Sequence, residues 1–416
     1  MSCFQYKNSV LHAEGVSLQT LAARQGTPLY VYSRSHLLSQ YRSLADAMAP
    51  VQPLICYSVK ACSNSAVIGT FASEGSGFDI VSGGELFRVL RAGGDASKVV
   101  FAGVGKTTGE IELALRKGIL FFTVESEPEA RRISDCARRL KKTGRIAFRV
   151  NPDVNPKTHK YITTGKRETK FGLDIERATR AYEMAAVLPN IEIAGIHLHI
   201  GSQILSAAPF AQSLRKVRPL CEQLKARFPA FKYMDIGGGI GIQYSPAQAP
   251  LEASQYAKAV IPLLRRLGLS VVLEPGRYLV GNSAVLVCRV QYVKNSFGRK
   301  FIVVDAGMND LVRPALYEAY HEVSPVRLTR RTIKGDLVGP ICESSDFIAL
   351  DRRLPDVWEG DLLAIRSAGA YGFAMSSNYN SRPRPAEVMV QGRKACVVRE
   401  RERPDDLVRG EKNPRF

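Results

Sequence analysis

The sequence lacks the features that would place the protein in a membrane or outside the cell. No apolar run approaches the roughly 20 residues that cross a bilayer as a helix. The start, MSCFQYKNSVLHAEG, has neither the basic beginning nor the apolar core of a secretory signal. We therefore expect a cytoplasmic protein that does not associate with membranes.

Paired cysteines are also absent. The eight cysteines are scattered, and no two of them form a CxxC pair. A chain of 416 residues with isolated cysteines is typical of free thiols in a reducing compartment, not of a disulfide framework or a zinc site. We expect no bound metal, and we predict that most of the cysteines are small core residues. Cys342 is the exception that we single out.

Acidic residues are in deficit. The chain has 58 Lys and Arg residues against 39 Asp and Glu residues, a formal net charge of +19. Such an excess can indicate nucleic-acid binding. The basic residues are spread along the chain, however, and the aromatic-basic interleaving of an RNA-binding sheet is absent. We expect a field that attracts anionic substrates or aids solubility, and nucleic acid is not an expected partner.

The chain does contain a repeated alternation of strand-like and helix-like segments. Strand–helix alternation implies parallel strands joined by crossover helices. Eight units over roughly 230 residues predict a (β/α)8 TIM-type barrel, with a doubly wound open sheet as the alternative. The eight β-rich runs are LICYSVK (54–60), GFDIVS (77–82), KVVFAG (98–103), LFFTVES (120–126), RIAFRVNP (145–152), IEIAGIHLHIGS (191–202), YMDIGGG (233–239) and VVLEPGR (271–277).

The pattern changes after about residue 283. AVLVCRVQYVKNS, KFIVVDAG, DLLAIRSAG and AEVMVQGRKACVVRE alternate with period two, and Gly and Pro stand between them, which predicts a mostly antiparallel β-domain. The length suits two domains. We predict an N-terminal segment, residues 1–25, that packs with the β-domain, a barrel over residues 26–283 and a β-domain over residues 284–416.

Unusual polar residues fall at the ends of the predicted barrel strands, the face that carries function in such barrels. A lysine at a strand end usually has its head in water, and a strand histidine is more often a hydrogen-bonded core group than a catalyst. The presence of all these groups on one rim favours a shared site. The groups are Lys60, Asp79, His197, His199, Gly201, Ser202, Asp235, Gly237, Gly238, Gly239, Glu274, Gly276 and Arg277.

Part of this rim is suited to a phosphate. The glycine run 237–239 lets backbone N–H groups approach an anion, and Ser202 and Arg277 add a hydroxyl and a cation. A phosphate site beside a reactive amine, a histidine and a buried carboxylate suits pyridoxal 5'-phosphate. VGKTT (104–108) is not a P-loop, because Val100 stands where GxxxxGK[ST] needs glycine.

Seven stretches together resemble one family: YSVKACSN, GFDIVSGGEL, HLHIGSQ, DIGGG, EPGRYLV, CESSD and GAYGFAMSSNYNSRPRPAEV. They are similar to the motifs of the fold-type III, alanine-racemase-like pyridoxal-phosphate decarboxylases, and most closely to those of the diaminopimelate decarboxylases. The resemblance runs from about residue 25 to residue 400. It implies decarboxylation of meso-2,6-diaminopimelate to L-lysine and CO2, the last step of lysine biosynthesis.

The resemblance also implies which residues hold the cofactor. Lys60 corresponds to the Schiff-base lysine, His199 to the residue stacked on the ring, and Glu274 to the carboxylate at the pyridine nitrogen. Asp79 corresponds to an acid near the lysine. The positions that correspond to phosphate contacts are Ser202, Gly237, Gly238, Gly239, Gly276 and Arg277, with Tyr371 near both phosphate and substrate.

The substrate side follows from the same resemblance. Arg277, Arg313 and Tyr317 correspond to residues that hold substrate carboxylates, and Glu343 to one that faces the distal amino group. Because diaminopimelate carries an amino acid centre at each end, a cation and an anion together suit its distal end. Cys342 corresponds to the proton donor, which in this family comes from the partner subunit. A homodimer with shared active sites is therefore implied, with Lys60, His199 and Cys342 as catalytic residues.

Several alternatives stay open. A decarboxylase of the same fold could act on L-lysine, L-ornithine or carboxynorspermidine. An amino acid racemase of the same barrel would need a second base, and a non-catalytic relative would not need both Lys60 and Cys342. Two departures from the family pattern, Cys62 and the VGKTT turn, could alter cofactor affinity or loop packing.

Overall fold

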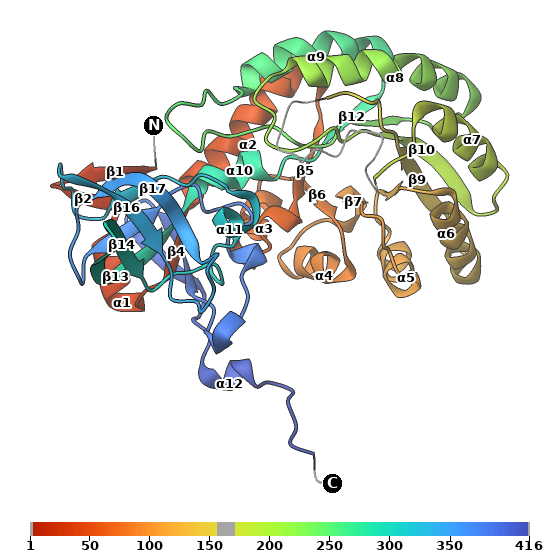
Figure 1. Cartoon of the computed structure of the whole chain (residues 1–416). Coiled ribbons are helices and arrows are strands. Elements are labelled where there is room, and N and C mark those ends of the chain that lie inside the picture. Colours follow the sequence, from red (N-terminus) through yellow and green to blue (C-terminus); the bar gives the residue numbers. More distant parts are fainter. Residues whose placement is uncertain (1–2, 156–170, 415–416) are drawn as a thin grey trace. The chain divides into compact units, whose positions relative to one another are not determined.

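The computed structural model describes residues 3–155 and 171–414, which form two compact units (Figure 1). The barrel unit consists of Leu38–Ile242 and Ala249–Leu279. The β-unit consists of Met1–Leu37, Gln243–Gln248 and Val280–Phe416. Among the described residues, no helix combines the length and the apolar character needed to cross a membrane.

Eight parallel strands close into a barrel, and β12 pairs with β5 to complete it. All eight predicted strand runs are present, so the predicted TIM-type barrel is confirmed and the open-sheet alternative is wrong. The strands are β5 (Leu54–Ser58), β6 (Gly77–Ile80), β7 (Val99–Phe101), β8 (Phe121–Val124), β9 (Gly144–Arg149), β10 (Ile191–His197), β11 (Tyr233–Asp235) and β12 (Ser270–Leu273).

Helices follow the strands along the chain and flank the barrel in Figure 1. Their ends carry ordinary stop and start signals: α5 begins with a capping box between Thr107 and Glu110 and ends at Gly118, which adopts the left-handed conformation. The helices are α2 (Arg34–Met48), α3 (Ser65–Ala72), α4 (Gly83–Arg91), α5 (Thr108–Lys117), α6 (Glu127–Leu140), α7 (Ile175–Ala186), α8 (Ala208–Arg227), α9 (Ala253–Leu267) and α10 (Arg277–Val280).

The inside of the barrel has two layers of different character. An apolar layer packs together Cys56, Val100, Leu120, Phe121, Ala147, Ala194 and Val272, with Tyr233 against it. Side chains on a strand alternate between its two faces, so the residue two positions further along points into the barrel again. From Cys56, Ala147, Tyr233 and Val272 that step leads to a polar layer, which we define as Ser58, Asp79, Arg149, His197, Asp235 and Glu274, all buried.

The β-unit contains the predicted, mostly antiparallel sheet, with strand order β17-β16-β14-β13-β4-β19-β20 and with β15 and β18 attached. Among the described strands of this unit, only the β14–β16 and β4–β19 pairs are parallel. Its strands are β4 (Leu29–Ser33), β13 (Ala284–Ser296), β14 (Arg299–Val304), β15 (Val323–Pro325), β16 (Thr332–Val338), β17 (Phe347–Pro355), β18 (Leu362–Ile365), β19 (Ala386–Gln391) and β20 (Lys394–Arg399). Its short helices are α11 (Arg313–Tyr317) and α12 (Pro404–Leu407).

The N-terminal elements pack in the β-unit. β1 (Phe4–Lys7), β2 (Val10–Ala13) and β3 (Val16–Ser17) form a small sheet, followed by α1 (Leu18–Gln25). Phe4, Leu11 and Leu18 share a buried cluster with Val285 and Val388. β4 lies beyond the predicted segment 1–25, yet it pairs with β13 and β19. The limits 26 and 283 for the barrel therefore stay a prediction, beside a β-unit that is assembled from three parts of the chain.

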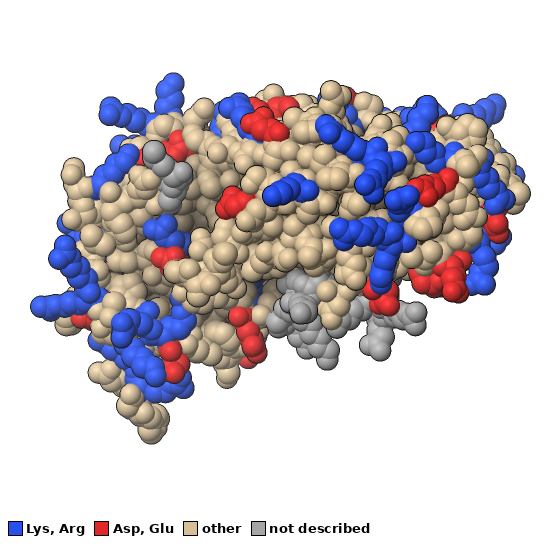
Figure 2. Space-filling view, turned by 90° about the horizontal axis from the view of Figure 1, so that it is seen from above, with Lys and Arg blue, Asp and Glu red and all other residues tan. Residues whose placement is uncertain are grey.

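Basic residues are scattered over the face seen in Figure 2, with acidic residues between them. The segment RRISDCARRLKKTGR, expected to be the wet side of a helix and its end, falls on α6 and the turn after it. Ile133, Cys136 and Ala137 are buried there, while Arg138 and Arg139 point outward. The basic residues of this segment are therefore explained as the solvent-facing side of an amphipathic helix.

Candidate active site

Lys60 lies in the turn Val59–Ala61, immediately after β5. Its Nζ donates a hydrogen bond to Asp79 Oδ2, and Ser58 Oγ donates to the same oxygen at 2.6 Å. Asp79 is fully buried, whereas 36% of the Lys60 side chain is exposed. Burial and the neighbouring Glu274 raise the pKa of Asp79, although Lys60 opposes the shift. The Lys60 amine is thus held by a buried carboxylate inside the barrel, while part of the lysine side chain remains accessible to solvent.

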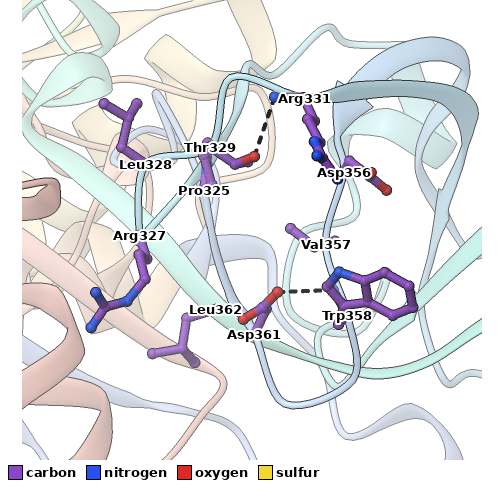
Figure 3. A pocket seen from close by; sticks show the side chains of 10 residues that line it. All are labelled: Pro325, Arg327, Leu328, Thr329, Arg331, Asp356, Val357, Trp358, Asp361 and Leu362. Atoms are coloured by element: carbon purple, nitrogen blue, oxygen red, sulfur yellow. Dashed lines mark hydrogen bonds between the residues drawn. The ribbon is translucent and has the colours of Figure 1, made fainter.

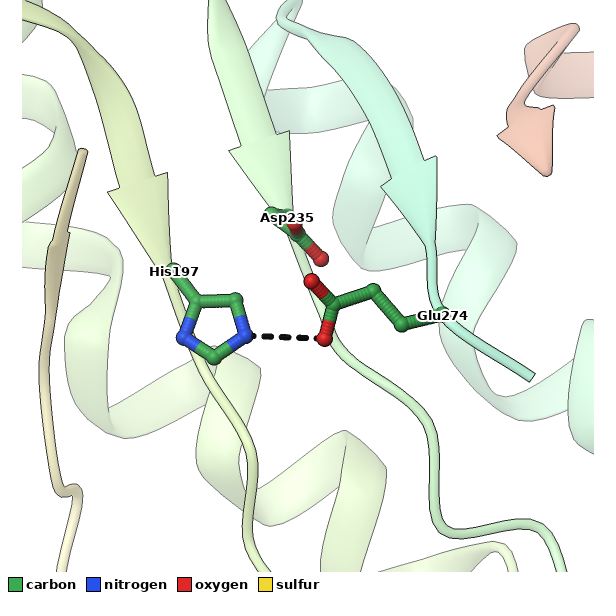
Figure 4. Close-up of side chains that lie close together, drawn as sticks. All are labelled: His197, Asp235 and Glu274. Carbon is green, nitrogen blue, oxygen red and sulfur yellow. Dashed lines mark hydrogen bonds and ion pairs between the residues drawn. The ribbon is translucent and has the colours of Figure 1, made fainter. Parts of the chain in front are cut away.

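A second cluster joins β10, β11 and the end of β12 (Figure 4). His197 Nε2 lies 3.0 Å from Glu274 Oε2, and an ionised carboxylate has no proton, so the ring nitrogen donates. Asp235 lies beside the other oxygen of Glu274 (Figure 4). Burial opposes ionisation of Glu274, but His197 and Lys60 outweigh it and lower its pKa to about 2. Burial and Glu274 raise the pKa of Asp235 well above its usual range.

His199 and the glycine run contact one another. The Gly238 N–H donates to His199 Nδ1 at 3.3 Å, and the Gly237 N–H donates to Asp235 Oδ1 at 2.9 Å. Burial, Arg149 and Lys60 lower the pKa of His199 well below its usual value. The ring is therefore neutral, with its proton on Nε2.

Close packing of the backbone is a sufficient reason for glycine at positions 237–239, without any ligand. A Cβ at Gly238 would collide with Glu274 O, and one at Gly239 with Gly201 O. Two of the three N–H groups expected to face an anion already donate to side chains. A phosphate contact by this run therefore stays a prediction.

Arg277 and Ser202 lie together at the barrel rim. Arg277 is buried at the start of α10, and its Nη2 donates to Ser202 Oγ at 3.1 Å. A Cβ at Gly276 would lie 3.0 Å from Ser58 Cβ and 3.1 Å from Ala61 Cβ. The absence of a side chain at Gly276 thus lets α10 begin close to the turn that carries Lys60.

The remaining predicted site residues belong to the β-unit. Arg313 begins α11 and Tyr317 ends it. Arg313 is buried, with Nη1 2.8 Å from His321 Nε2 and its guanidinium 4.7 Å from the centre of the Tyr244 ring. These contacts hold the guanidinium in one orientation before any ligand binds.

Cys342 and Glu343 share one turn of the β-unit. Cys342 is exposed, and its backbone N–H donates to Asn380 Oδ1 at 2.8 Å. The Ser344 N–H donates to Glu343 Oε1 at 3.0 Å. Tyr371 lies after β18 with φ of 56°. The structure thus brings the predicted barrel residues together in one unit. In the other unit, Arg313 and Tyr317 share one short helix, and Cys342 and Glu343 share one turn.

Two charged residues in the barrel, Arg149 and Glu85, were not predicted as part of a site. Arg149 ends β9 and donates to Glu125 Oε1 at 3.1 Å and to the His199 carbonyl oxygen at 3.3 Å. Burial raises the pKa of Glu85 to about 7, with opposing contributions from the Val81 N–H and Lys60. The signal that drew attention to Lys60, a charge at the end of an apolar strand run, also applies to Arg149.

The turn VGKTT has a structural explanation. Lys106 is buried, and its Nζ donates to the carbonyl oxygens of Gly103 and Thr123 and to Glu129 Oε1, at 2.8, 2.7 and 2.6 Å. Three acceptors satisfy the three protons of an ammonium group. Lys106 is therefore committed to the protein itself, in agreement with the rejection of a P-loop.

A surface pocket of about 270 Å3 lies in the β-unit, between Arg327, Leu328 and the exposed Trp358 (Figure 3). Its floor and walls contain none of the predicted site residues. This pocket is therefore separate from the predicted site.

Comparison with known proteins agrees with this geometry. Residues 34–281 match the family described as pyridoxal-dependent decarboxylase, pyridoxal binding domain. A diaminopimelate decarboxylase of Pseudomonas aeruginosa is 48% identical over 412 residues, 99% of each chain. The chain belongs to the diaminopimelate decarboxylase family.

Solved structures of family members have the same fold. That of diaminopimelate decarboxylase from Helicobacter pylori complexed with L-lysine has a TM-score of 0.91 and 38% identity, and covers 94% of this chain and 98% of that one. The enzyme from M. jannaschii in complex with L-lysine has a TM-score of 0.94 and 35% identity, and covers 100% and 99%. The resemblance stated from sequence is thereby confirmed.

The residues of the barrel unit fit a pyridoxal group. Lys60 offers a partly exposed amine, and Glu274 offers a buried, ionised carboxylate whose Oε1 has no hydrogen-bond partner among the described residues. The rim beside them holds a buried arginine bound to a hydroxyl, a donor set that suits a phosphate. Amine, carboxylate and cation are the three chemical types that this cofactor needs.

Proposed function

We propose that this chain removes CO2 from meso-2,6-diaminopimelate and forms L-lysine, with pyridoxal 5'-phosphate as cofactor. The observation that carries the proposal is the 48% identity to a diaminopimelate decarboxylase along 99% of both chains. The barrel cluster of Lys60, His199 and Glu274 supports it, because these groups lie together in one unit.

In this proposal Lys60 would hold the cofactor through its aldehyde group, with loss of water, and Asp79 would hold the lysine. Glu274 would serve the pyridine nitrogen and His199 the face of the ring. The residues that would hold the phosphate are Ser202, Gly237, Gly238, Gly239, Gly276 and Arg277, with Tyr371 beside them. When bound, the cofactor supplies an electron sink for the electron pair released as CO2 departs.

The protonation states of the chain's own groups suit this task. Glu274, with its pKa lowered to about 2, remains an anion at neutral pH and so favours a protonated pyridine nitrogen. His199, with its pKa lowered, stays neutral and adds no competing positive charge. Asp79 accepts the hydrogen bond of Lys60 Nζ and keeps that nitrogen at the end of β5.

Residues of the β-unit supply substrate recognition and the proton. Arg313 and Tyr317 bind the distal carboxylate, Glu343 binds the distal ammonium group, and Arg277 and Tyr371 contribute on the proximal side. The contacts of Arg313 with His321 and Tyr244 support this role, because a preordered guanidinium loses little entropy on binding a carboxylate. Cys342 Sγ donates the proton that replaces CO2. This Cys342 belongs to the second copy of the chain in a cytoplasmic homodimer.

A substrate panel tests the proposal. The cofactor-loaded protein is offered meso-diaminopimelate, L-lysine, L-ornithine and carboxynorspermidine, and both CO2 and the amine product are measured. We expect CO2 and L-lysine from meso-diaminopimelate alone. Turnover of another member of the panel would contradict the roles of Arg313 and Glu343, and turnover of none by loaded protein would contradict the decarboxylase proposal.

A further inference from the structure

The contacts of Glu274 raise the question of what keeps this carboxylate in the required state. His197, Asp235 and Glu274 come from three neighbouring strands and are almost fully buried. One ligand-type atom of each lies within 4.8 Å of the others. Two carboxyl groups this close in a buried site do not both ionise at ordinary pH, because each charge raises the pKa of the other group.

The hydrogen-bond partners decide which of the two carboxyl groups holds the charge. Glu274 accepts from His197 Nε2 at 3.0 Å, while the hydrogen bond that Asp235 accepts among the described residues comes from a backbone N–H, that of Gly237. The ring nitrogen therefore favours the charge on Glu274. The raised pKa of Asp235 and the lowered pKa of Glu274 agree with this assignment.

One proton, shared between Asp235 and Glu274, provides a hydrogen bond for two buried carboxyl oxygens. Among the described residues, neither Asp235 Oδ2 nor Glu274 Oε1 has a hydrogen-bond partner by ordinary geometry. Asp235 and Glu274 Oε1 face one another in Figure 4. A proton on Asp235 Oδ2 lets it donate to Glu274, and a carboxylate oxygen has two acceptor sites, so capacity remains for a further donor.

We propose that His197 and Asp235 are positioning residues that hold Glu274 as an oriented anion, His197 by donating to Oε2 and Asp235, as a neutral acid, by donating to Oε1. The inference rests on the proposed function, since the orientation of Glu274 matters only if it faces the pyridine nitrogen. The other titratable groups that interact electrostatically with this pair include Lys60, Asp79 and His199, and the pair in turn helps to raise the pKa of the neighbouring Cys56 and Tyr256.

The test at His197 compares His197→Gln with His197→Phe. A glutamine amide can donate from nearly the position of Nε2, whereas phenylalanine keeps the ring volume without a donor. We measure the dissociation constant of pyridoxal 5'-phosphate and the pH dependence of its bound absorption band. We expect His197→Gln to stay within about threefold of the parent and His197→Phe to bind at least ~10-fold more weakly with a shifted pH profile. If phenylalanine matches the parent more closely than glutamine does, His197 only fills the core and the inference is wrong.

The test at Asp235 compares Asp235→Asn with Asp235→Leu. Asparagine keeps an acceptor for the Gly237 N–H and a neutral donor for Glu274, while leucine keeps only the size. We expect the asparagine variant to retain cofactor affinity within about threefold and the parent pH profile, and leucine to lose about tenfold. Equal losses in both variants would show that Asp235 acts as an anion. This pair also decides the question if His197→Phe does not fold.

A matched control is Asp310→Asn in the β-unit. Asp310 is also buried, accepts a backbone N–H, that of Gly307, at 3.0 Å, and has its pKa raised by burial to about 7. Its replacement should leave the cofactor band and affinity unchanged. A loss of cofactor affinity in Asp310→Asn as large as that of Asp235→Leu would mean that replacing any buried aspartate perturbs the protein, and would overturn the inference.

Two further measurements separate the possible failures. If the parent protein does not bind pyridoxal 5'-phosphate, the proposed function is wrong. If the parent binds it and the variants bind it with the same affinity as the parent, only the inference is wrong. His197, Asp235 and Glu274 also form a donor set that suits a divalent cation. Elemental analysis showing one such ion per chain, lost in His197→Phe, would replace the hydrogen-bond account.

Discussion

The two layers inside the barrel come from the same strands and differ in what they do. Val272 and Glu274 are two residues apart on one side, as are Cys56 and Ser58 on another. The apolar layer buries surface and stabilises the fold. The polar layer buries carboxylates and a guanidinium, which opposes folding unless each finds partners. A step of two residues along a strand thus separates the part that holds the barrel together from the part that can do chemistry.

The largest expected effect separates the layers by function. Lys60→Ala should lower CO2 release from meso-diaminopimelate by roughly 10³-fold or more, because no group in the polar layer beside it is an amine that could take its place. The melting temperature should change little, since the Lys60 side chain is partly exposed, and Asp79, whose pKa is raised, keeps the hydrogen bond from Ser58. Lys98→Ala, a barrel lysine outside the polar layer, is the control and should keep full activity. Normal turnover in Lys60→Ala would end the proposed role.

A change in the apolar layer should have the opposite signature. Phe121 is fully buried and packs on Tyr233, with ring centres 5.6 Å apart. Phe121→Ala should lower the free energy of unfolding by about 4 kcal/mol through lost burial and a residual cavity. Denaturant unfolding measures this, and kcat per folded molecule should stay at the parent value. A large fall in kcat in the folded variant would mean that the layers are not separable.

Lys106 sharpens the comparison, because it is a buried lysine outside the polar layer. Lys106→Met keeps the aliphatic stem but leaves Glu129 without its cation, so we expect a loss of about 3 kcal/mol in unfolding free energy. Cofactor affinity in the folded fraction should not change. Weaker cofactor binding with unaltered stability would instead indicate a phosphate contact by the VGKTT turn.

The smallest effect concerns Glu85. Its folded pKa of about 7 lies above the ordinary value of 4.5, so the folded state binds more protons than the unfolded state between these two values. Stability due to this group is full below pH 4.5 and is lost as pH rises to about 7. Glu85→Gln should therefore be more stable than the parent at pH 8, by about 1 kcal/mol after solvent screening, and equal to it at pH 4. Unfolding curves at both pH values measure this difference, and a pH-independent difference would contradict the assignment.

The strands and most of the barrel site were predictable because both depend on local pattern. An apolar run followed by a polar residue locates a strand end, and parallel strands of a barrel bring their ends to one face. That is why Lys60, His199 and Glu274 could be placed together before the fold was known.

The remaining features depend on pairing between distant parts of the chain. The contact of Asp235 with Glu274 follows from strand neighbours, and the partners of Lys106 and Arg149, which are Glu129 and Glu125, come from other elements. β4 pairs with β13, a strand that begins only at Ala284. Periodicity along one strand contains no information about such partners.

The central claim is that Lys60, beside the polar layer, holds pyridoxal 5'-phosphate. Borohydride reduction of the loaded protein, followed by digestion and mass spectrometry of the peptides, tests it directly. The account predicts one phosphopyridoxyl group per chain, attached to Lys60 in the peptide that contains YSVKACSN. A group attached to another lysine, such as Lys106, or no attached group at all, would contradict it.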